Sequence, residues 1–169
     1  MNKSIVYLIC LMVLLFVGVT GCGPQDETRT FPNTRYVESY DGVSVAVPEN
    51  PKRILALSSA SDTILLGLVE PDRLVGINTL STYEEYSLEA KRAKLVKPAM
   101  SSYPLEKIIA LEPDLVIAPD YTSADVIAGL RHMGIPTVVV PTGTTVESVI
   151  KNVTDIAHIV GEDEKGQFY

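Results

Sequence analysis

The chain has 169 residues, of which 46% are hydrophobic and 21% are charged. This composition excludes a disordered or collagen-like chain, and the length predicts one ordinary domain. Asp and Glu outnumber Lys and Arg by 21 to 14, giving a formal net charge of −7, so no nucleic-acid partner is expected.

Residues 1–21 are predicted to be a secretory leader, with one charge at Lys3 and an unbroken apolar run over Ile5–Val19. The run ends in Val19-Thr20-Gly21-Cys22, which resembles the lipobox of bacterial lipoproteins. The resemblance implies cleavage before Cys22, lipidation of its thiol, and an exported chain anchored to the cell membrane by lipid. The alternative is a transmembrane anchor, but the apolar run is shorter than the roughly 20 residues that cross a bilayer.

Residues 22–35 are predicted to be a polar tether, because Phe31 is their only large apolar residue and they include two prolines. The next segment, Tyr36–Val47, alternates around Asp41-Gly42, a dipeptide typical of tight turns. This pattern predicts an antiparallel hairpin ahead of the main domain.

Beyond the hairpin, short apolar runs alternate with helix-like segments. The predicted strands are 54–57, 74–77, 115–118 and 137–140; the predicted helices are 63–69, a tyrosine-bearing segment after 77, one starting at Pro104, one ending near Met133, and 146–160. Such alternation predicts right-handed crossovers and an α/β fold with a mainly parallel sheet flanked by helices. Ligands of such sheets bind beyond the carboxyl ends of the strands.

No catalytic constellation is found in the sequence. A Ser-His-Asp or Cys-His site needs a histidine beside its nucleophile, and both histidines, His132 and His158, fall in predicted helices away from the strand-end loops. The chain has no glycine-rich phosphate loop and no CxxC or HxxxH spacing. We therefore expect no enzyme activity, no resident cofactor and no directly ligated metal, although a metal could arrive inside a chelate.

The strand-end loops contain hydroxyl groups and tyrosines instead. Tyrosine combines a flat apolar face with one polar group, which suits a large organic ligand held by stacking and a few hydrogen bonds. The candidate ligand-binding residues are Ser59, Ser61, Tyr83, Tyr86, Ser101, Ser102, Tyr103, Asp120 and Tyr121.

Each candidate also has a structural interpretation. Ser59 or Ser61 is expected to be the N-cap of the following helix, which would also present backbone N–H groups to a ligand. Tyr83 and Tyr103 either line a cleft or lie at the edge of the core. Asp120 is expected to cap a helix rather than contact ligand.

Several longer segments resemble one family, the substrate-binding proteins of bacterial ABC importers for iron-siderophores, haem and cobalamin. The strongest is Pro104–Ala118, PLEKIIALEPDLVIA, which looks like a helix-to-strand segment of that family. Further similar segments occur in the family's order: Pro51–Leu57, Ile64–Leu68, Asp72–Ile77 and Leu130–Val140.

The resemblance implies two α/β lobes joined by one long helix, with the ligand clamped between them. Residues 36–160 would be the N-terminal lobe and 161–169 the start of the connecting helix, and a C-terminal lobe is absent from this sequence. In the family, an acidic residue at the position of Glu106 pairs with arginines of the permease. Otherwise Glu106 is an exposed glutamate favoured at a helix N-terminus.

The function expected from this resemblance is capture of an iron chelate, haem or cobalamin and its delivery to an ABC permease. A lone-lobe surface adaptor or an inactive fragment is the first alternative, and it would show no ligand binding. A flavodoxin-like enzyme is the second, and it would show turnover or a bound flavin.

Overall fold

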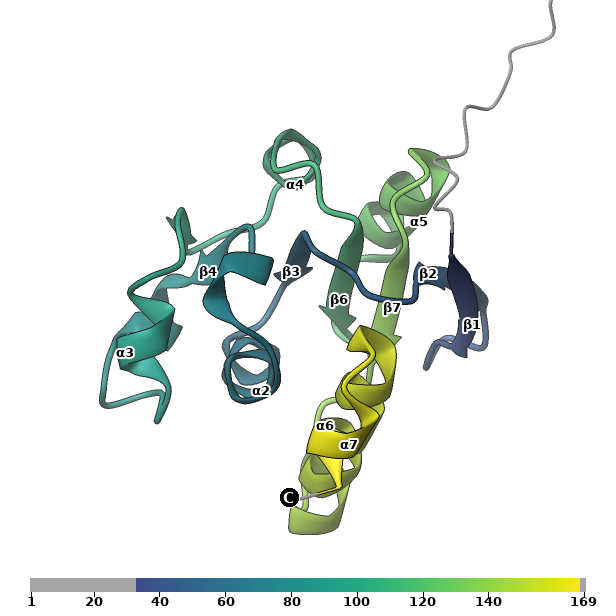
Figure 1. The fold of residues 1–169 in the computed structure, drawn as a ribbon. Helices are drawn as coiled ribbons and strands as arrows, with labels where there is room; N and C mark the ends of the chain where they lie inside the picture. Colours follow the sequence, from purple (N-terminus) through teal and green to yellow (C-terminus); the bar gives the residue numbers. More distant parts are fainter. Residues whose placement is uncertain (1–32, 168–169) are drawn as a thin grey trace, which may run out of the picture.

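The structure, a computed structural model, describes residues 33–167 (Figure 1). The predicted leader, Cys22 and most of the predicted tether lie outside these residues. Strands β1 (Thr34–Glu38) and β2 (Ser44–Pro48) pair antiparallel, which confirms the hairpin and starts it slightly earlier than predicted. At the turn, Gly42 has a φ of +77°, which glycine adopts without strain.

The central sheet is parallel, as predicted. Strands β3 (Ile54–Ala56), β6 (Leu115–Pro119) and β7 (Thr137–Val140) pair in the order β3-β6-β7. A second parallel pair, β4 (Ile77–Asn78) and β5 (Ala99–Met100), continues the sheet because Leu74 bridges Ile54 of β3. The order across the sheet is therefore β5-β4-β3-β6-β7.

The strand predicted over 74–77 is broken because its backbone changes partner. The amide of Val75 donates to the Ile54 carbonyl at 3.0 Å, whereas the amide of Ile77 donates to the Pro98 carbonyl at 3.0 Å. The segment therefore leaves β3 for β5 within two residues. Strand β5 was not predicted, because two paired residues produce no hydrophobic period.

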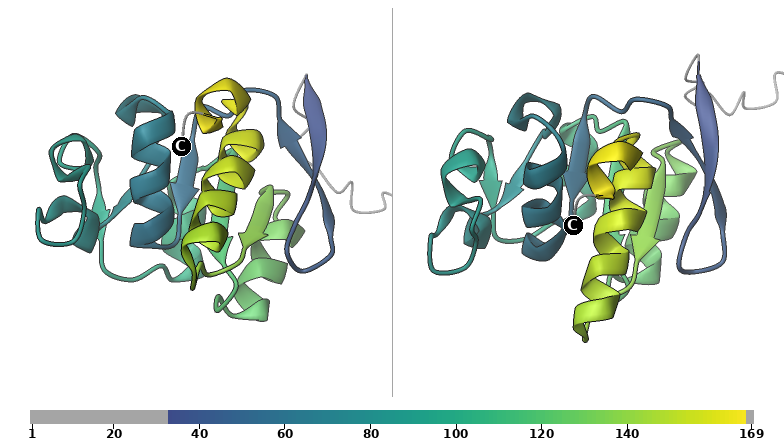
Figure 2. Two further views of the ribbon diagram at one scale, coloured as in Figure 1. Left: turned by 90° about the horizontal axis from the view of Figure 1, so that it is seen from below. Right: turned by 60° about the horizontal axis from the view of Figure 1, so that its bottom comes forward.

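Helices cover both faces of the sheet. Helices α2 (Ser59–Leu68) and α6 (Val146–Val160) lie side by side on one face (Figure 2). Helices α4 (Leu105–Ala110) and α5 (Ala124–His132) lie on the other (Figure 1). Successive residues along β3 and β6 point to opposite faces of the sheet and so pack in two separate cores. The core beneath α2 and α6 contains Ile54, Ala56, Leu115 and Ile117, and the core beneath α4 and α5 contains Leu55, Leu57, Val116 and Ala118.

Three helix predictions need correction. Helix α2 begins at Ser59, four residues before the predicted start, because Ser58 caps it. The tyrosine-bearing helix after 77 is wrong: the 3-10 helix η2 (Thr79–Thr82) ends before Tyr83, and the next helix is the short α3 (Ala90–Ala93). Pro104 is the N-cap of α4 rather than its first residue. A further 3-10 helix, η1, spans Pro71–Arg73.

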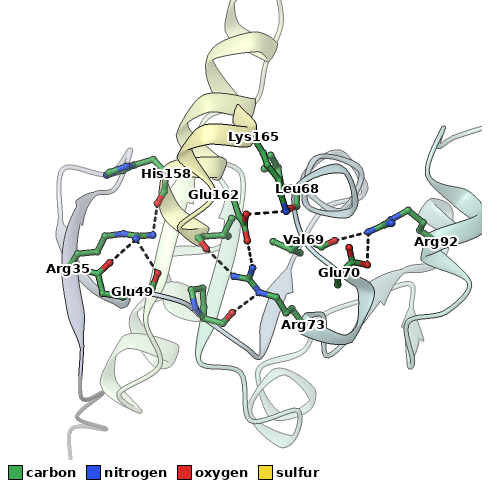
Figure 3. Close-up of polar contacts among 12 residues, drawn as sticks. Arg35, Glu49, Leu68, Val69, Glu70, Arg73, Arg92, His158, Glu162 and Lys165 are labelled. Atoms are coloured by element: carbon green, nitrogen blue, oxygen red, sulfur yellow. Dashed lines mark hydrogen bonds and ion pairs between the residues drawn. The ribbon is translucent and has the colours of Figure 1, made fainter. Parts of the chain in front are cut away.

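The last elements lie at the amino edge of the sheet, where α2 and α6 end. Arg73 donates to the Glu162 carboxylate at 2.6 Å and to the Val160 carbonyl at 3.0 Å (Figure 3). Lys165, in the short helix α7 (Asp163–Gly166), donates to the Leu68 carbonyl at 2.7 Å. These cations satisfy carbonyls at the two helix ends, where positive charge is favoured. We call Arg73, Glu162 and Lys165 the clasp.

Candidate functional site

The sheet order places a topological switch point between β3 and β6. From β3 the chain moves outward to β4 and β5, and it then returns to the other side of β3 for β6 and β7. Loops that leave neighbouring strands in opposite directions open a crevice at the carboxyl ends of the strands. A pocket of about 380 Å³ lies there. Its walls come from residues 58–61, Thr63, Ile64, Pro119, Tyr121, Val140–Gly143, Val149, Asn152 and Ile156.

The serine-rich loop after β3 forms one wall through its own hydrogen bonds. The Ser58 Oγ accepts from the Ser61 amide at 3.2 Å, and the two hydroxyls are 2.9 Å apart. Ser58 is therefore the N-cap, and the prediction of Ser59 or Ser61 in that role was wrong. Ser61 is buried by this arrangement, whereas Ser59 is half-buried beside exposed Ala60.

Asp120 joins the loops that follow β6 and β7. Its carboxylate accepts from the Thr142 hydroxyl at 2.6 Å and from the Thr142 amide at 3.1 Å. These hydrogen bonds lower the pKa of Asp120 below its ordinary value. The N-cap of α5 is Ser123, so the expectation that Asp120 caps a helix was wrong. The neighbouring Tyr121 is 71% exposed and lines the pocket.

The other predicted site residues follow β4 and β5, at the same edge of the sheet but outside the pocket lining. Tyr83 and Tyr86 are exposed and meet edge to face, with ring centroids 6.5 Å apart. Ser101 and Ser102 are exposed, and Tyr103 is half-buried against the core that contains α4. The structure therefore gathers Ser59, Ser61 and Tyr121 around one pocket, braced by Asp120, and leaves five candidates beside it.

Asp62 is an important residue that the sequence analysis did not single out. Its carboxylate is 1% exposed and accepts from the Asn78 amide at 2.7 Å and the Ser81 hydroxyl at 2.9 Å. Burial raises its pKa to about 7. Burial and the nearby Asp62 also raise the pKa of Tyr103. No local pattern marks this burial, because Asp125 and Glu147 are also acids in first helical turns after buried strands, yet both are exposed.

The arrangement supports binding by shape, stacking and hydrogen bonds. Both histidines are exposed on helices, and His158 pairs with Asp163 at 2.8 Å rather than with a serine or cysteine of the site. Within residues 33–167, no group of three or more His, Cys, Asp or Glu side chains is arranged to hold a metal ion. Over the same range, no helix is long and apolar enough to span a bilayer.

Comparison with known proteins agrees with this architecture. Residues 54–169 match the family described as periplasmic binding protein. An uncharacterized ABC transporter substrate-binding lipoprotein of Bacillus subtilis, YvrC, is 30% identical over 166 residues, covering 91% of this chain and 51% of that protein. The vitamin B12-binding protein of Vibrio campbellii is 32% identical over 120 residues, covering 69% of this chain and 41% of that protein.

A solved structure gives the same fold. The periplasmic solute binding protein from Veillonella parvula superimposes with a TM-score of 0.68 at 23% identity, over 80% of this chain and 44% of that one. This chain spans about half the length of YvrC, although the match covers 91% of this chain. It belongs to the periplasmic binding protein family, whose members bind substrates for transport and are not enzymes.

Proposed function

We propose that this protein is a lipid-anchored substrate-binding protein of an ABC importer that captures an iron chelate, haem or cobalamin. The observation that carries the proposal is the pocket at the switch point, lined by hydroxyl groups and exposed Tyr121. A large planar or macrocyclic ligand can stack on such a surface and accept a few hydrogen bonds. The vitamin B12-binding relative is consistent with a ligand of this kind.

In this proposal, residues 36–160 form the N-terminal lobe and supply one wall of a ligand cleft. Half-buried Ser59 and exposed Tyr121 contact the ligand directly, and buried Ser61 shapes the pocket wall through its hydrogen bonds with Ser58. The remaining candidates extend the contact surface along the same edge: Tyr83, Tyr86, Ser101, Ser102 and Tyr103. Asp120 holds two of the loops together through Thr142. Residues 161–169 begin the connection to a second lobe, and α7 lies in that range.

Ligand binding is the direct test. The chain has eight tyrosines and no tryptophan, so a coloured ligand bound at Tyr121 will quench tyrosine emission. Titration with cyanocobalamin, a ferric tris-hydroxamate and haemin should give saturable quenching for at least one of them. Absence of saturation with all three would refute ligand capture by this chain and would favour an adaptor or an inactive fragment.

Glu106 is proposed to dock the permease. It is exposed in the first turn of α4, the helix that follows β5 at the carboxyl edge of the sheet. Glu106→Gln should slow ligand uptake by cells without changing ligand affinity. Glu164→Gln is the matched control, because Glu164 is also an exposed glutamate in a first helical turn, that of α7 at the opposite edge of the sheet. Equal uptake by the two variants would contradict the docking role.

Cys22 is proposed to carry the lipid after removal of residues 1–21. Cys22→Ala should move the protein from the membrane fraction to the soluble fraction of cells. The mass of the membrane-extracted protein should exceed that of the chain from Cys22 onward by the mass of acyl chains and glycerol. An unmodified mass would contradict lipidation.

A further inference from the structure

The pocket at the switch point is uncharged. Every side chain that lines it within the described residues is apolar, a hydroxyl or an amide, and none is Lys, Arg, His, Asp or Glu. The amide, Asn152, uses its Nδ2 to donate to the Pro141 carbonyl at 2.8 Å. A ligand seated here therefore finds no cation within the pocket wall.

The loops around the pocket also lack cations. The segments that follow the five strands, 57–62, 78–89, 101–104, 119–123 and 141–145, contain no Lys, Arg or His, but they contain Asp62, Glu84, Glu85, Glu89 and Asp120. Lys94 of the α3 region pairs with Glu84 at 3.4 Å, and Arg92 approaches Glu89 at 3.8 Å. These two cations are thus paired with loop carboxylates. Arg131, which lines a neighbouring cavity with Asp120, is paired with Asp41 at 2.7 Å.

Asp120 places a negative charge beside the pocket, because it lies in sequence between the lining residues Pro119 and Tyr121. Its carboxylate is exposed, and its two hydrogen bonds from Thr142 stabilise the ionised form. The same bonds use the Thr142 hydroxyl and amide as donors to Asp120. Those two donors are therefore not free to bind an anionic ligand.

Two helices that begin at this edge, α2 and α6, line the pocket, and side-chain caps occupy some of the amide groups at their N-termini. In α2, the Ser61 amide donates to the Ser58 Oγ. In α6, a capping box pairs Thr145 and Ser148, and the Ser148 Oγ also accepts from the Thr144 amide. An exposed acid in the first turn of α6, Glu147, further offsets the positive end of that helix dipole. The caps and the Glu147 carboxylate together reduce the attraction of these helix N-termini for anions.

From this charge distribution we infer that the site selects ligands without net negative charge. The inference rests on the proposed function and narrows its ligand class. Neutral or cationic chelates, such as ferric tris-hydroxamates, and neutral corrinoids match the uncharged wall and acidic rim. Ferric tris-catecholates, polycarboxylate chelates and haem, with its propionates, bring anionic groups that this lobe leaves without a counter-charge.

Two matched ligand pairs test the inference on the chain as it exists. The first pair is a ferric tris-hydroxamate and a ferric tris-catecholate, which share the metal and differ in charge. The second pair is cyanocobalamin and its carboxylate hydrolysis product, which share the corrin ring. In each pair the uncharged member should bind at least about tenfold more tightly, and added salt should narrow the difference by screening repulsion.

A pair of variants locates the effect at the pocket. Ala60 is exposed in the first turn of α2 and lines the pocket, so Ala60→Arg places a cation there. Ala60→Arg should strengthen binding of the anionic member of each pair by up to about fivefold, as expected for an exposed ion pair. Ala60→Gln, of similar length but neutral, should leave the preference unchanged.

The outcomes separate the two proposals. Tighter binding of the uncharged members supports the charge selection. Equal or tighter binding of the anionic members overturns the charge selection while leaving ligand capture intact. Failure of all four ligands to bind overturns ligand capture by this chain, and the charge selection with it.

Discussion

The buried carboxylate of Asp62 should make a contribution to the free energy of unfolding that decreases as pH rises from acid to neutral. Asp62 is 1% exposed, and its Oδ2 accepts two hydrogen bonds, from the Asn78 amide and the Ser81 hydroxyl. Its Oδ1 is buried without a hydrogen-bond partner among the described residues. Ionising Asp62 therefore costs more free energy in lost hydration than these two hydrogen bonds recover. Burial accordingly raises the pKa of Asp62 from 3.8 to about 7.

The sign and size of this change in the free energy of unfolding follow from proton linkage. A raised pKa means that the folded state holds its proton more tightly than the unfolded state, so the stabilising effect is complete below the unfolded pKa. It is lost as pH rises through the folded pKa. A rise from 3.8 to about 7 corresponds to about 4 kcal/mol, with ~1.4 kcal/mol for each pKa unit.

Asp62→Asn removes the titration while keeping an oxygen to accept from Asn78 and Ser81. The free energy of unfolding of the variant minus that of the wild type should increase with pH by up to about 4 kcal/mol between about pH 4 and pH 8. Any pH-independent cost of the amide cancels from this slope. Urea unfolding followed by tyrosine fluorescence, at a series of pH values, measures it.

Asp41→Asn is a control of opposite sign. The hydrogen bond from Arg131 lowers the pKa of Asp41 to about 2, so its stabilising effect is present above the unfolded pKa and is lost in acid. The variant should therefore be less stable than the wild type at neutral pH, and the gap should close below about pH 2. A flat Asp62→Asn difference beside a sloping Asp41→Asn difference would refute the account of Asp62.

Two further pairs of variants test the pocket and the end of α6. Tyr121→Ala should weaken ligand binding about tenfold, because truncating an aromatic anchor costs more than ~1 kcal/mol. Tyr36 lies on the hairpin and is as exposed as Tyr121, at 72% against 71%, so Tyr36→Ala should leave ligand affinity unchanged. Gly161 and Gly42 both have φ of +77°, but a Cβ at Gly161 would lie 2.5 Å from the Glu49 carbonyl oxygen, whereas none lies within 4 Å at Gly42. In urea unfolding, Gly161→Ala should therefore cost a further ~1–3 kcal/mol beyond Gly42→Ala, and equal costs would contradict that contact.

The fold was predictable where local patterns agree with tertiary structure. The Asp41-Gly42 turn sets the hairpin register, and α6 has both a capping box at Thr145 and a glycine at its end, Gly161. Each of these signals lies within a few residues of the element that it defines. The parallel sheet followed from the alternation of such elements along the chain.

Other features depend on partners that are distant in sequence. The break after Leu74 arises because Ile77 pairs with the segment at Pro98, and no local pattern encodes that choice. Asp120 follows a strand and precedes a helix, as a cap would, yet its partner is Thr142, which lies 22 residues away. The same limit applies to Asp62, whose burial is completed by Ser81.

Helix α6 runs from the pocket to the clasp. Val149, Asn152 and Ile156 line the pocket, while the carbonyl of Val160 is held by Arg73 in the clasp. With 15 residues, the helix is about 22 Å long and is fixed at both termini. A wall fixed in this way loses little conformational freedom when a ligand binds, so most of the contact energy is retained as affinity. The clasp therefore supports the pocket from the opposite edge of the sheet, even though none of its residues lines the pocket.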